Sequence, residues 1–200
     1  MKDLGEVSTI LGMQITRNRD NIKIDQSKYI NDVLYRFEMN ECNPISTPID
    51  TNQKLSVSMC PKNENERREM SKVPYMQAIG SLLYAAQVSR PDITYAVNIL
   101  SRFSTNPGRA HWEAVKRVMR YLKGTATVGL EYKFDVEISI VRYCDADWAG
   151  NTDDRQSTTG YIFIYQSAAI SWLTKKQKTV ALSSTEAEFM SLTAAMQESV

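Results

Sequence analysis

Two short stretches contain the residues best suited to chemistry, "YCDADWAG" at 143–150 and "TEAE" at 185–188. Asp145 follows a run rich in β-branched and aromatic residues, which predicts a strand that ends near this acid. Glu188 lies one turn into a segment that opens with a capping-box pattern, which predicts a helix. Two-metal hydrolases hold a pair of Mg²⁺ ions roughly 3.5–4 Å apart with carboxylates from separate elements. Asp145 and Glu188 are therefore candidate metal ligands and catalytic acids.

The same acids have a purely structural interpretation. Acids at strand ends and in the first turns of helices commonly form turns or complement the helix dipole. We interpret Asp147, Asp153 and Asp154 as turn residues and Glu186 as the acid of the capping box. Residue type alone leaves both interpretations of Asp145 and Glu188 open.

A basic face is predicted on the segment 109–124, whose apolar residues repeat with helical spacing. Its cations oppose a single acid, Glu113; they are Arg109, Lys116, Arg117, Arg120 and Lys123. Such a stripe suits phosphate contacts, which give sequence-independent and salt-dependent affinity. The stretch "TKKQK" adds Lys175 and Lys176 as a second basic cluster near the predicted helix of Glu188. An ordinary solvated helix face is the alternative for the first cluster.

The composition argues against several other classes of function. His111 is the only histidine, so a histidine-based nucleophile or a zinc site lacks residues, and we expect His111 to pack at the start of its helix. The net charge of +1 gives no whole-chain signal for nucleic acid or membrane. Three cysteines without paired spacing favour a reducing compartment. A charged N-terminus without a long apolar run predicts no signal peptide and no membrane span, so we expect an intracellular protein.

Periodicity predicts the elements that position these residues. Alternating residues between 7 and 24 predict a hairpin, and Ser27 is the expected cap of the helix that follows. The proline-rich, charged segment 43–74 predicts a connector without regular structure. Helices are expected at 75–90, 91–104 and 109–124, then three strands at 137–148, 159–167 and 168–176, then a helix that contains Glu188. The predicted elements change from helices to strands near Asp135, and we place a domain boundary there.

The stretch from "YCDADWAG" to "TEAEFMSLTAA" resembles the ribonuclease H domain of copia-type retrotransposon Pol polyproteins in residue identity and spacing. Upstream, "DLGEVSTILGMQI", "VPYMQAIGSLLYAAQVSRPDITYAVNILSRFS" and "HWEAVKRVMRYLKGT" resemble the end of the palm, the thumb and the connection region of the same reverse transcriptase. The resemblance implies an α+β fold. Residues 1–134 would form the palm-end hairpin, the helical thumb and the connection region, and residues 135–200 an α/β ribonuclease H-like domain, truncated at its C-terminus.

The resemblance also implies an activity and its site. Asp145 and Glu188 match the first two catalytic acids of a Mg²⁺-dependent ribonuclease that hydrolyses the RNA strand of RNA/DNA hybrids. The family's third Asp and a further acid find no match before Val200, and the polymerase's Tyr-x-Asp-Asp turn finds none either. We therefore expect an incomplete two-metal site and little activity from these 200 residues alone. Expected partners are a hybrid or other nucleic acid and the remainder of Pol, in the cytoplasm, within a virus-like particle, or in the nucleus, with no membrane.

A non-catalytic protein is the competing hypothesis. The chain would then be a relic or a co-opted module that binds nucleic acid or protein through its basic helix, and its acids would be structural. The shortage of catalytic acids favours this hypothesis for the isolated chain. Mg²⁺ bound near Asp145 would distinguish the two.

Overall fold

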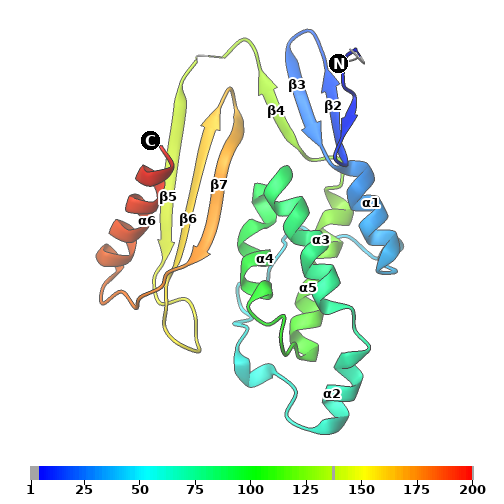
Figure 1. The fold of residues 1–200 in the computed structure, drawn as a ribbon, viewed down its shortest axis with the longest axis vertical. Helices are drawn as coiled ribbons and strands as arrows, with labels where there is room; N and C mark the ends of the chain where they lie inside the picture. The colour runs from blue at the N-terminus through cyan, green and yellow to red at the C-terminus, as the bar shows by residue number, and fades with distance from the viewer. Residues whose placement is uncertain (1–4, 137, 200) are drawn as a thin grey trace.

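The N-terminal part of the chain forms a small antiparallel sheet. A computed structural model describes residues 5–136 and 138–199 (Figure 1). The sheet has the order β1 (Thr9–Ile10), β2 (Met13–Arg17), β3 (Asn21–Asp25), β4 (Leu130–Lys133). The predicted hairpin is confirmed as β2 and β3. The pairing of β4 with β3 was not predicted, because their contact joins Ile24 to Leu130 across the whole helical region.

Helix α1 (Ser27–Arg36) follows β3 directly and buries Ile30, Val33 and Leu34, as its spacing predicts. The prediction that Ser27 caps this helix is wrong. Ser27 is its first helical residue, and the Ser27 hydroxyl donates to Asp25 at 2.7 Å instead of accepting from the helix backbone. The cap position belongs to Gln26, which is fully buried and accepts a hydrogen bond from the Ser89 hydroxyl.

The connector contains more regular structure than its sequence predicts. A single 3-10 turn, η1 (Val57–Met59), precedes helix α2 (Glu64–Ser71), so the prediction of an irregular 43–74 is wrong for these residues. The Asn63 side chain caps α2 by accepting from the Glu66 N–H, and Glu66 accepts from Lys62 N–H in return. Helix α2 buries no residue. Hydrophobic periodicity therefore could not reveal it, although the Asn-x-x-Glu spacing could have.

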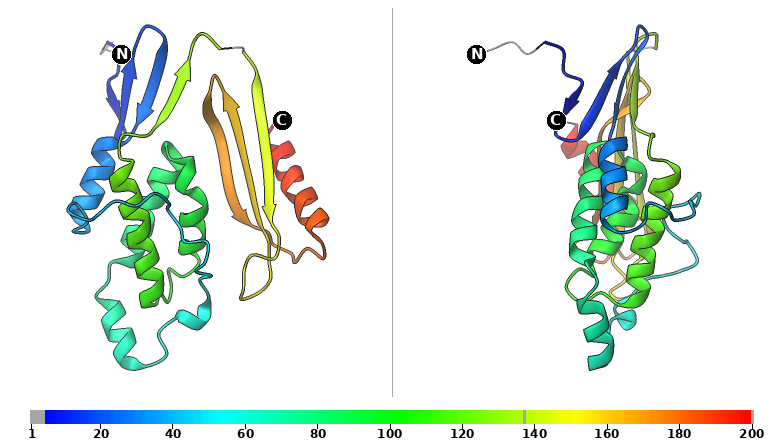
Figure 2. Two further views of the ribbon diagram at one scale, coloured as in Figure 1. Left: turned by 180° about the vertical axis from the view of Figure 1, so that it is seen from behind. Right: turned by 90° about the vertical axis from the view of Figure 1, so that its right-hand side faces the viewer.

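Three helices form the main hydrophobic core: α3 (Tyr75–Val88), α4 (Thr94–Ser101) and α5 (Arg109–Gly124). They were predicted, except that the second opens with a separate 3-10 turn, η2 (Pro91–Ile93). Fully buried residues from all three meet there, among them Leu82, Val97 and Val115. Helix α1 packs against the same group through α5 (Figure 2).

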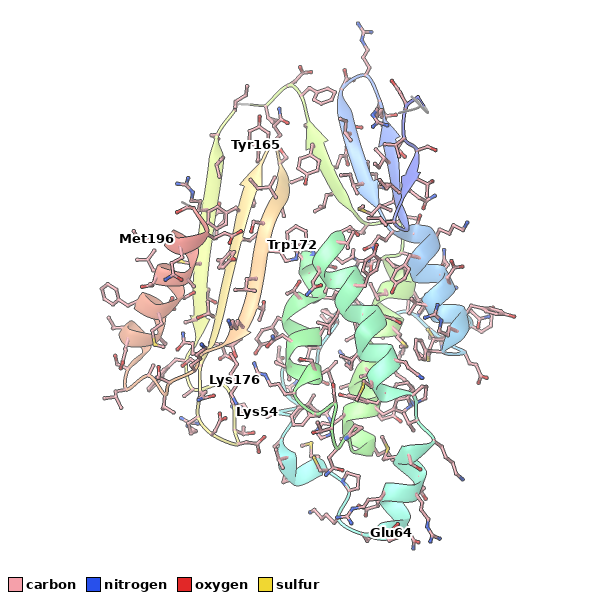
Figure 3. All side chains as sticks on the ribbon, in the orientation of Figure 1. Lys54, Glu64, Tyr165, Trp172, Lys176 and Met196 are labelled. Atoms are coloured by element: carbon pink, nitrogen blue, oxygen red, sulfur yellow. The ribbon has the colours of Figure 1, made fainter. Side chains whose placement is uncertain are left out.

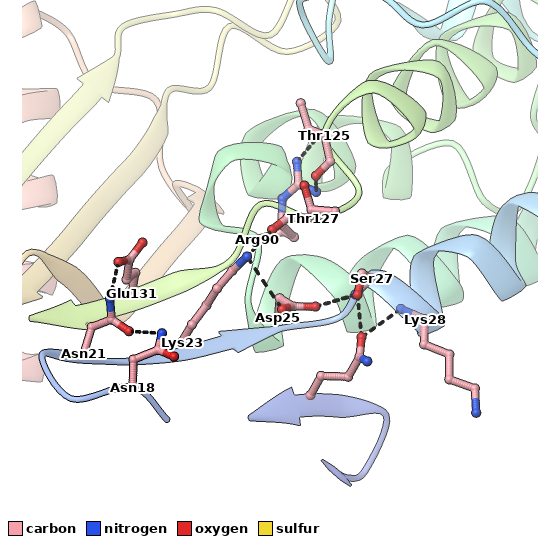
Figure 4. A network of polar contacts seen from close by, with 11 residues as sticks. Asn18, Asn21, Lys23, Asp25, Ser27, Lys28, Arg90, Thr125, Thr127 and Glu131 are labelled. Atoms are coloured by element: carbon pink, nitrogen blue, oxygen red, sulfur yellow. Dashed lines mark hydrogen bonds and ion pairs between the residues drawn. The ribbon is translucent and has the colours of Figure 1, made fainter. Parts of the chain in front are cut away.

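The Arg90 side chain links the α3–α4 corner to the end of α5, and Figure 4 shows its contacts with Thr125. The Arg90 guanidinium, fully buried, donates to both oxygens of Asp92 and to the carbonyl and hydroxyl of Thr125. Burial alone would raise the pKa of Asp92, but the hydrogen bonds and charge of Arg90 hold it below its usual range. Because removal of Asp92 would leave the buried Arg90 charge without its counter-ion, this pair fixes the corner that starts α4.

A second antiparallel sheet has the order β5 (Ile140–Asp147), β6 (Thr158–Tyr165), β7 (Ala168–Lys176), and α6 (Ser184–Glu198) follows it. The predicted three strands and the capped helix are confirmed. Ser183 caps α6 by accepting from Glu186 N–H, while the Glu186 carboxylate accepts from Leu182 N–H. Helix α6 covers one face of the sheet and α3 and α4 lie beside the other (Figure 1).

The α+β class is thus confirmed, with a helical core and two separate sheets that touch each other through β4 and β7. The second sheet docks through polar contacts: Trp172 Nε1 donates to the Ala86 carbonyl at 2.8 Å and Asn98 Nδ2 to the Thr174 carbonyl at 3.0 Å. Tyr132 on β4 donates to the Ala169 carbonyl. The division of the chain near Asp135 stays a prediction.

Candidate active site and nucleic-acid interface

The faces of the second sheet decide which side chains can meet. Strand residues alternate between faces. One face of the sheet contacts the helical core through three hydrogen bonds. Tyr95 donates to Asp147, Arg102 donates to Thr158, and Trp172 donates to the Ala86 carbonyl. Thr159 and Ser171 lie on the other face, because they are linked to Gln177 and to Glu198 of α6.

Asp145 is exposed and shares its face with Asp147, two residues along β5. It lies in the strand instead of at its very end, opposite Gly160 of β6. A cavity of about 280 Å³ on this face is lined by Asp145 together with Pro91, Thr94 and Trp172. The Asp145 carboxylate thus lies on the sheet face toward the helical core.

Glu188 is exposed on α6, which packs on the opposite face through Ala187, Ser191 and Ala195. The two predicted acids therefore leave the sheet on different sides and can approach each other only around the free edge of β5. Within 5–136 and 138–199, no three His, Cys, Asp or Glu side chains are grouped so as to hold a metal ion. The described residues by themselves do not fit a two-metal centre, and the pairing of Asp145 with Glu188 stays a prediction.

A larger cavity, about 400 Å³, lies between the helical core and the second sheet. Tyr95 donates to Asp147 at 3.0 Å, and burial together with the Asp147 charge raises the pKa of Tyr95 to about 12. Arg102 donates to Thr158 at 3.1 Å, and burial lowers the pKa of its guanidinium. Sequence reasoning missed this Tyr95–Asp147–Arg102 group because its members come from distant segments and match no motif.

Asp153 and Asp154, which were predicted to be turn residues, also make contacts outside their turn. Asp154 forms an Asx turn with Gln156 N–H and an ion pair with Lys176. Burial is the largest single influence on the pKa of Asp154 and would raise it, but the hydrogen bonds from Lys176 and Gln156 N–H, with the charges of Lys176 and Arg102, together hold it below its usual range. Asp153 accepts from Val57 N–H at 2.9 Å and so ties the β5–β6 loop to the connector. Lys176 is therefore paired, whereas Lys175 is exposed on the α6 side of β7.

The basic helix is partly covered by the connector. Arg120 donates to the Asn43 carbonyl at 2.7 Å, and Arg117 donates to Thr47 at 2.9 Å and lies 3.8 Å from Asp50. The prediction that Glu113 is the only opposing acid is wrong, because folding brings Asp50 to the same face. Arg117 and Arg120 hold the segment 43–50 against α5.

Three cations of α5 do not hold the connector. Lys116 pairs with Glu113 at 2.8 Å, a partly exposed i,i+3 pair that contributes little stability. Arg109 and Lys123 are exposed at opposite ends of the helix. These residues do not lie with Lys175 and Lys176, since β7 packs on α4 and the basic side of α5 faces the connector. The two predicted basic clusters are thus separate surfaces.

His111 packs at the start of α5, as predicted. It is fully buried and stacks on Phe103 with ring centroids 3.9 Å apart. Its Nδ1 accepts from Gly108 N–H at 2.9 Å, and its Nε2 lies 3.2 Å from the Ser56 carbonyl, to which it can donate. Gly108 is required there, because a Cβ would lie 1.8 Å from the Met59 carbonyl oxygen.

Comparison with known proteins identifies the family. Residues 1–51 match the family model described as "Reverse transcriptase (RNA-dependent DNA polymerase)". The chain is 49% identical over its whole length to the Retrovirus-related Pol polyprotein from transposon TNT 1-94 of Nicotiana tabacum. The chain belongs to the copia-type retrotransposon Pol family. This Pol chain spans 15% of the length of that polyprotein.

Shorter proteins also match this chain. The chain is 50% identical over 131 residues to "Secreted RxLR effector protein 161" of Plasmopara viticola, a match that covers 66% of this chain and 92% of that protein. It is 38% identical to "Uncharacterized mitochondrial protein AtMg00810" of Arabidopsis thaliana, over 96% of this chain and 77% of the relative. No solved structure gives a significant match. Across 5–136 and 138–199, no helix is both long and apolar enough to span a membrane.

Proposed function

We propose that this region of Pol handles RNA/DNA hybrids and contributes to hydrolysis of their RNA strand. One observation carries the proposal: a strand that bears Asp145, two further antiparallel strands and a helix that bears Glu188 occur in this order, in a chain 49% identical throughout to a Pol polyprotein. Mg²⁺ is the expected cofactor of the complete enzyme. It would activate the attacking water and stabilise the leaving oxygen.

The residues of this chain would supply only part of that centre. Asp145 and Glu188 offer two negative charges, too few for two divalent ions that prefer oxygen ligands. Further acids from elsewhere in Pol would have to lie near the free edge of β5, around which Asp145 and Glu188 could approach each other. The exposed cations Arg109, Lys123 and Lys175, together with the partly exposed Lys116, would contact phosphates.

The test uses a longer Pol protein that includes this region. Asp145→Asn and, separately, Glu188→Gln should abolish cleavage of the RNA strand while hybrid binding is retained. Asp147→Asn is the matched control, because it lies on the same strand and face and an amide oxygen can still accept from Tyr95. If the Asp147 variant loses as much activity as the Asp145 variant, the assignment of Asp145 fails.

A non-catalytic binding module is the second candidate. It is favoured by the placement of Asp145 and Glu188 on opposite faces of the sheet. Calorimetric titration of the 200-residue chain with Mg²⁺ separates the two. Uptake of Mg²⁺ that depends on Asp145 would count against this candidate.

A further inference from the structure

Helix α6 faces the second sheet with small side chains. Figure 3 shows Met196 of α6 on one side of this sheet and Trp172 on the other, toward the helical core. The buried row of α6 consists of Ala187, Ser191 and Ala195. Burial of apolar surface is non-directional, and these side chains bury little of it, so packing alone does not fix the position of α6 along the strands. Hydrogen bonds have to set that position.

Gln177 lies just after β7 and joins the second sheet to α6. Its side chain is buried, and its Nε2 donates to the Thr159 hydroxyl of β6 and to the Ala187 carbonyl of α6, both at 3.0 Å. Its backbone N–H donates to the Ser157 carbonyl at 2.9 Å. The carbon of the Ala187 carbonyl is bonded to the nitrogen of Glu188. Gln177 therefore holds the peptide at which Glu188 begins.

The amide of Gln177 is only partly satisfied. Its Oε1 is buried and has no hydrogen-bond partner among the described residues. The orientation of the amide follows from the Ala187 carbonyl, which can only accept, so the NH₂ group has to face it. A buried polar atom without a partner costs free energy. Because an apolar side chain of the same length would avoid that cost, stability alone does not account for a glutamine at this position.

Ser191 makes a second link between α6 and the sheet. Its fully buried hydroxyl donates to the Asp145 carbonyl at 2.6 Å and lies 3.1 Å from that of Gly160. A serine in a helix can instead donate to the carbonyl four residues earlier, here that of Ala187. That carbonyl already accepts from Gln177 and, as in any α-helix, from the N–H four residues on, so both of its lone pairs are used. The Ser191 hydroxyl is thereby left to the Asp145 carbonyl.

These two links set the place of Glu188 relative to β5. Glu188 precedes Ser191 by three residues, so it lies roughly 4.5 Å along the helix axis from the residue that contacts the Asp145 backbone. It lies on the flank of the buried row opposite Met190, whose sulfur is 4.0 Å from the Thr179 hydroxyl just after β7. Glu188 is thus on the β5 side of α6.

We propose, on the basis of the function proposed above, that Gln177 and Ser191 are positioning residues that hold Glu188 of α6 in register with Asp145 of β5. One hydrogen bond acts on the peptide that begins Glu188, and the other acts on the carbonyl of Asp145. The two are coupled, since Gln177 occupies the carbonyl to which Ser191 would otherwise donate. Loss of either bond would let the first turns of α6 shift along β5.

Cleavage kinetics of a longer Pol protein that includes this region test the positioning. Gln177→Met keeps the length of the side chain and Ser191→Ala nearly keeps its volume, but each removes one link. Each should lower kcat by about tenfold to a hundredfold and leave KM for the hybrid unchanged, because a displacement of about 1 Å can cost that much. The double variant should lose about as much as the more damaged single variant, because the two residues act as one unit.

Gln26→Met and Ser89→Ala are the matched controls. Gln26 and Ser89 are likewise a buried glutamine and a buried serine, and one amide atom of Gln26 also lacks a partner, but they join the ends of α1 and α3. They should leave kcat unchanged. An equal loss of kcat in the controls, or a change in KM instead of kcat, would overturn the proposal.

Amide hydrogen exchange of the 200-residue chain tests the two links without any cleavage. In Gln177→Met and Ser191→Ala, the amides of residues 184–191 should exchange about tenfold faster, the factor that corresponds to one net hydrogen bond, and those of α3 should not change. Unchanged exchange would overturn the positioning even where Pol cleaves normally. Faster exchange with an unchanged kcat would also overturn it. Cleavage that survives Asp145→Asn would instead refute the proposed function, and the positioning with it.

Discussion

His111 connects the start of α5 to the connector through two hydrogen bonds of opposite sense. Nδ1 accepts from Gly108 N–H, so this nitrogen carries no proton, while Nε2 can donate to the Ser56 carbonyl. Protonation of Nδ1 would set two N–H groups against each other inside a buried contact with Phe103. Burial lowers the pKa of His111, although the Ser56 carbonyl and the charge of Asp153 oppose the shift.

A pH prediction follows from this lowered pKa. The unfolded chain binds a proton at His111 at a higher pH than the folded chain does. The contribution of neutral His111 to the free energy of unfolding is therefore complete above the unfolded pKa of about 6.5, and it decreases as the pH falls through and below that value. Urea unfolding at pH 7.5 and 5.5 should show a larger loss of stability for the wild type than for His111→Gln. Equal losses would show that His111 does not titrate in this way.

The β6–β7 turn is an element whose sequence does not match its backbone. Gln166 and Ser167 form a two-residue hairpin loop with φ of 48° and 70°. This geometry favours Asn-Gly. The double substitution Gln166→Asn, Ser167→Gly should stabilise the fold by about 1 kcal/mol and raise Tm by about 2–4 °C.

The control for the turn is Ser139→Gly, because Ser139 itself does not have a positive φ, and this change should lower stability or leave it unchanged. Thermal unfolding followed by circular dichroism measures both variants. A decrease in Tm for the Asn-Gly variant would mean that Gln166 and Ser167 make contacts in the turn that outweigh its strain.

Helix α5 gives a prediction about nucleic acid that rests on Lys116 and Lys123, the two lysines on this helix that do not hold the connector. Lys116→Ala with Lys123→Ala should weaken hybrid binding and reduce the slope of log K against log salt by roughly one unit for each phosphate that the variant no longer binds. The matched control is Lys28→Ala with Arg36→Ala on α1, an exposed basic pair outside the proposed surface. Fluorescence anisotropy at several salt concentrations measures the slope. An unchanged slope in the first variant would show that this side of α5 is only solvated surface.

Most elements were predictable from sequence because their signals are local. The apolar spacing of α5, the alternation in β5–β7 and the Ser183 cap each depend on a few neighbouring residues. Helix α2 was missed because it is polar on all sides, and the β3–β4 pairing because it joins residues more than a hundred positions apart. The coverage of Arg117 and Arg120 was missed for the same reason, since a charge pattern on one helix does not reveal the segment that folds over it.

At the scale of the whole molecule, the second sheet docks on the helical core largely through polar contacts. Three hydrogen bonds cross this boundary: Tyr95 to Asp147, Arg102 to Thr158, and Trp172 to the Ala86 carbonyl. Trp172→Phe keeps most of the ring but removes the bond to the Ala86 carbonyl, so it should destabilise the fold by about 1–3 kcal/mol. Urea unfolding checks the value, with Trp148→Phe as the control because Trp148 is half exposed and bonds only a loop carbonyl. Equal effects would contradict a role for Trp172 in docking.

The location of the catalytic acids is the central question for the molecule as a whole. Cleavage of the RNA strand of a hybrid, measured with Mg²⁺ for the purified 200-residue chain and for a longer Pol protein that contains it, tests the account most directly. We expect the longer protein to cut and the 200-residue chain to bind the hybrid but cut it poorly or not at all, because Asp145 and Glu188 alone cannot hold two metal ions. Robust Mg²⁺-dependent cleavage by the 200-residue chain, abolished by Asp145→Asn, would contradict the account.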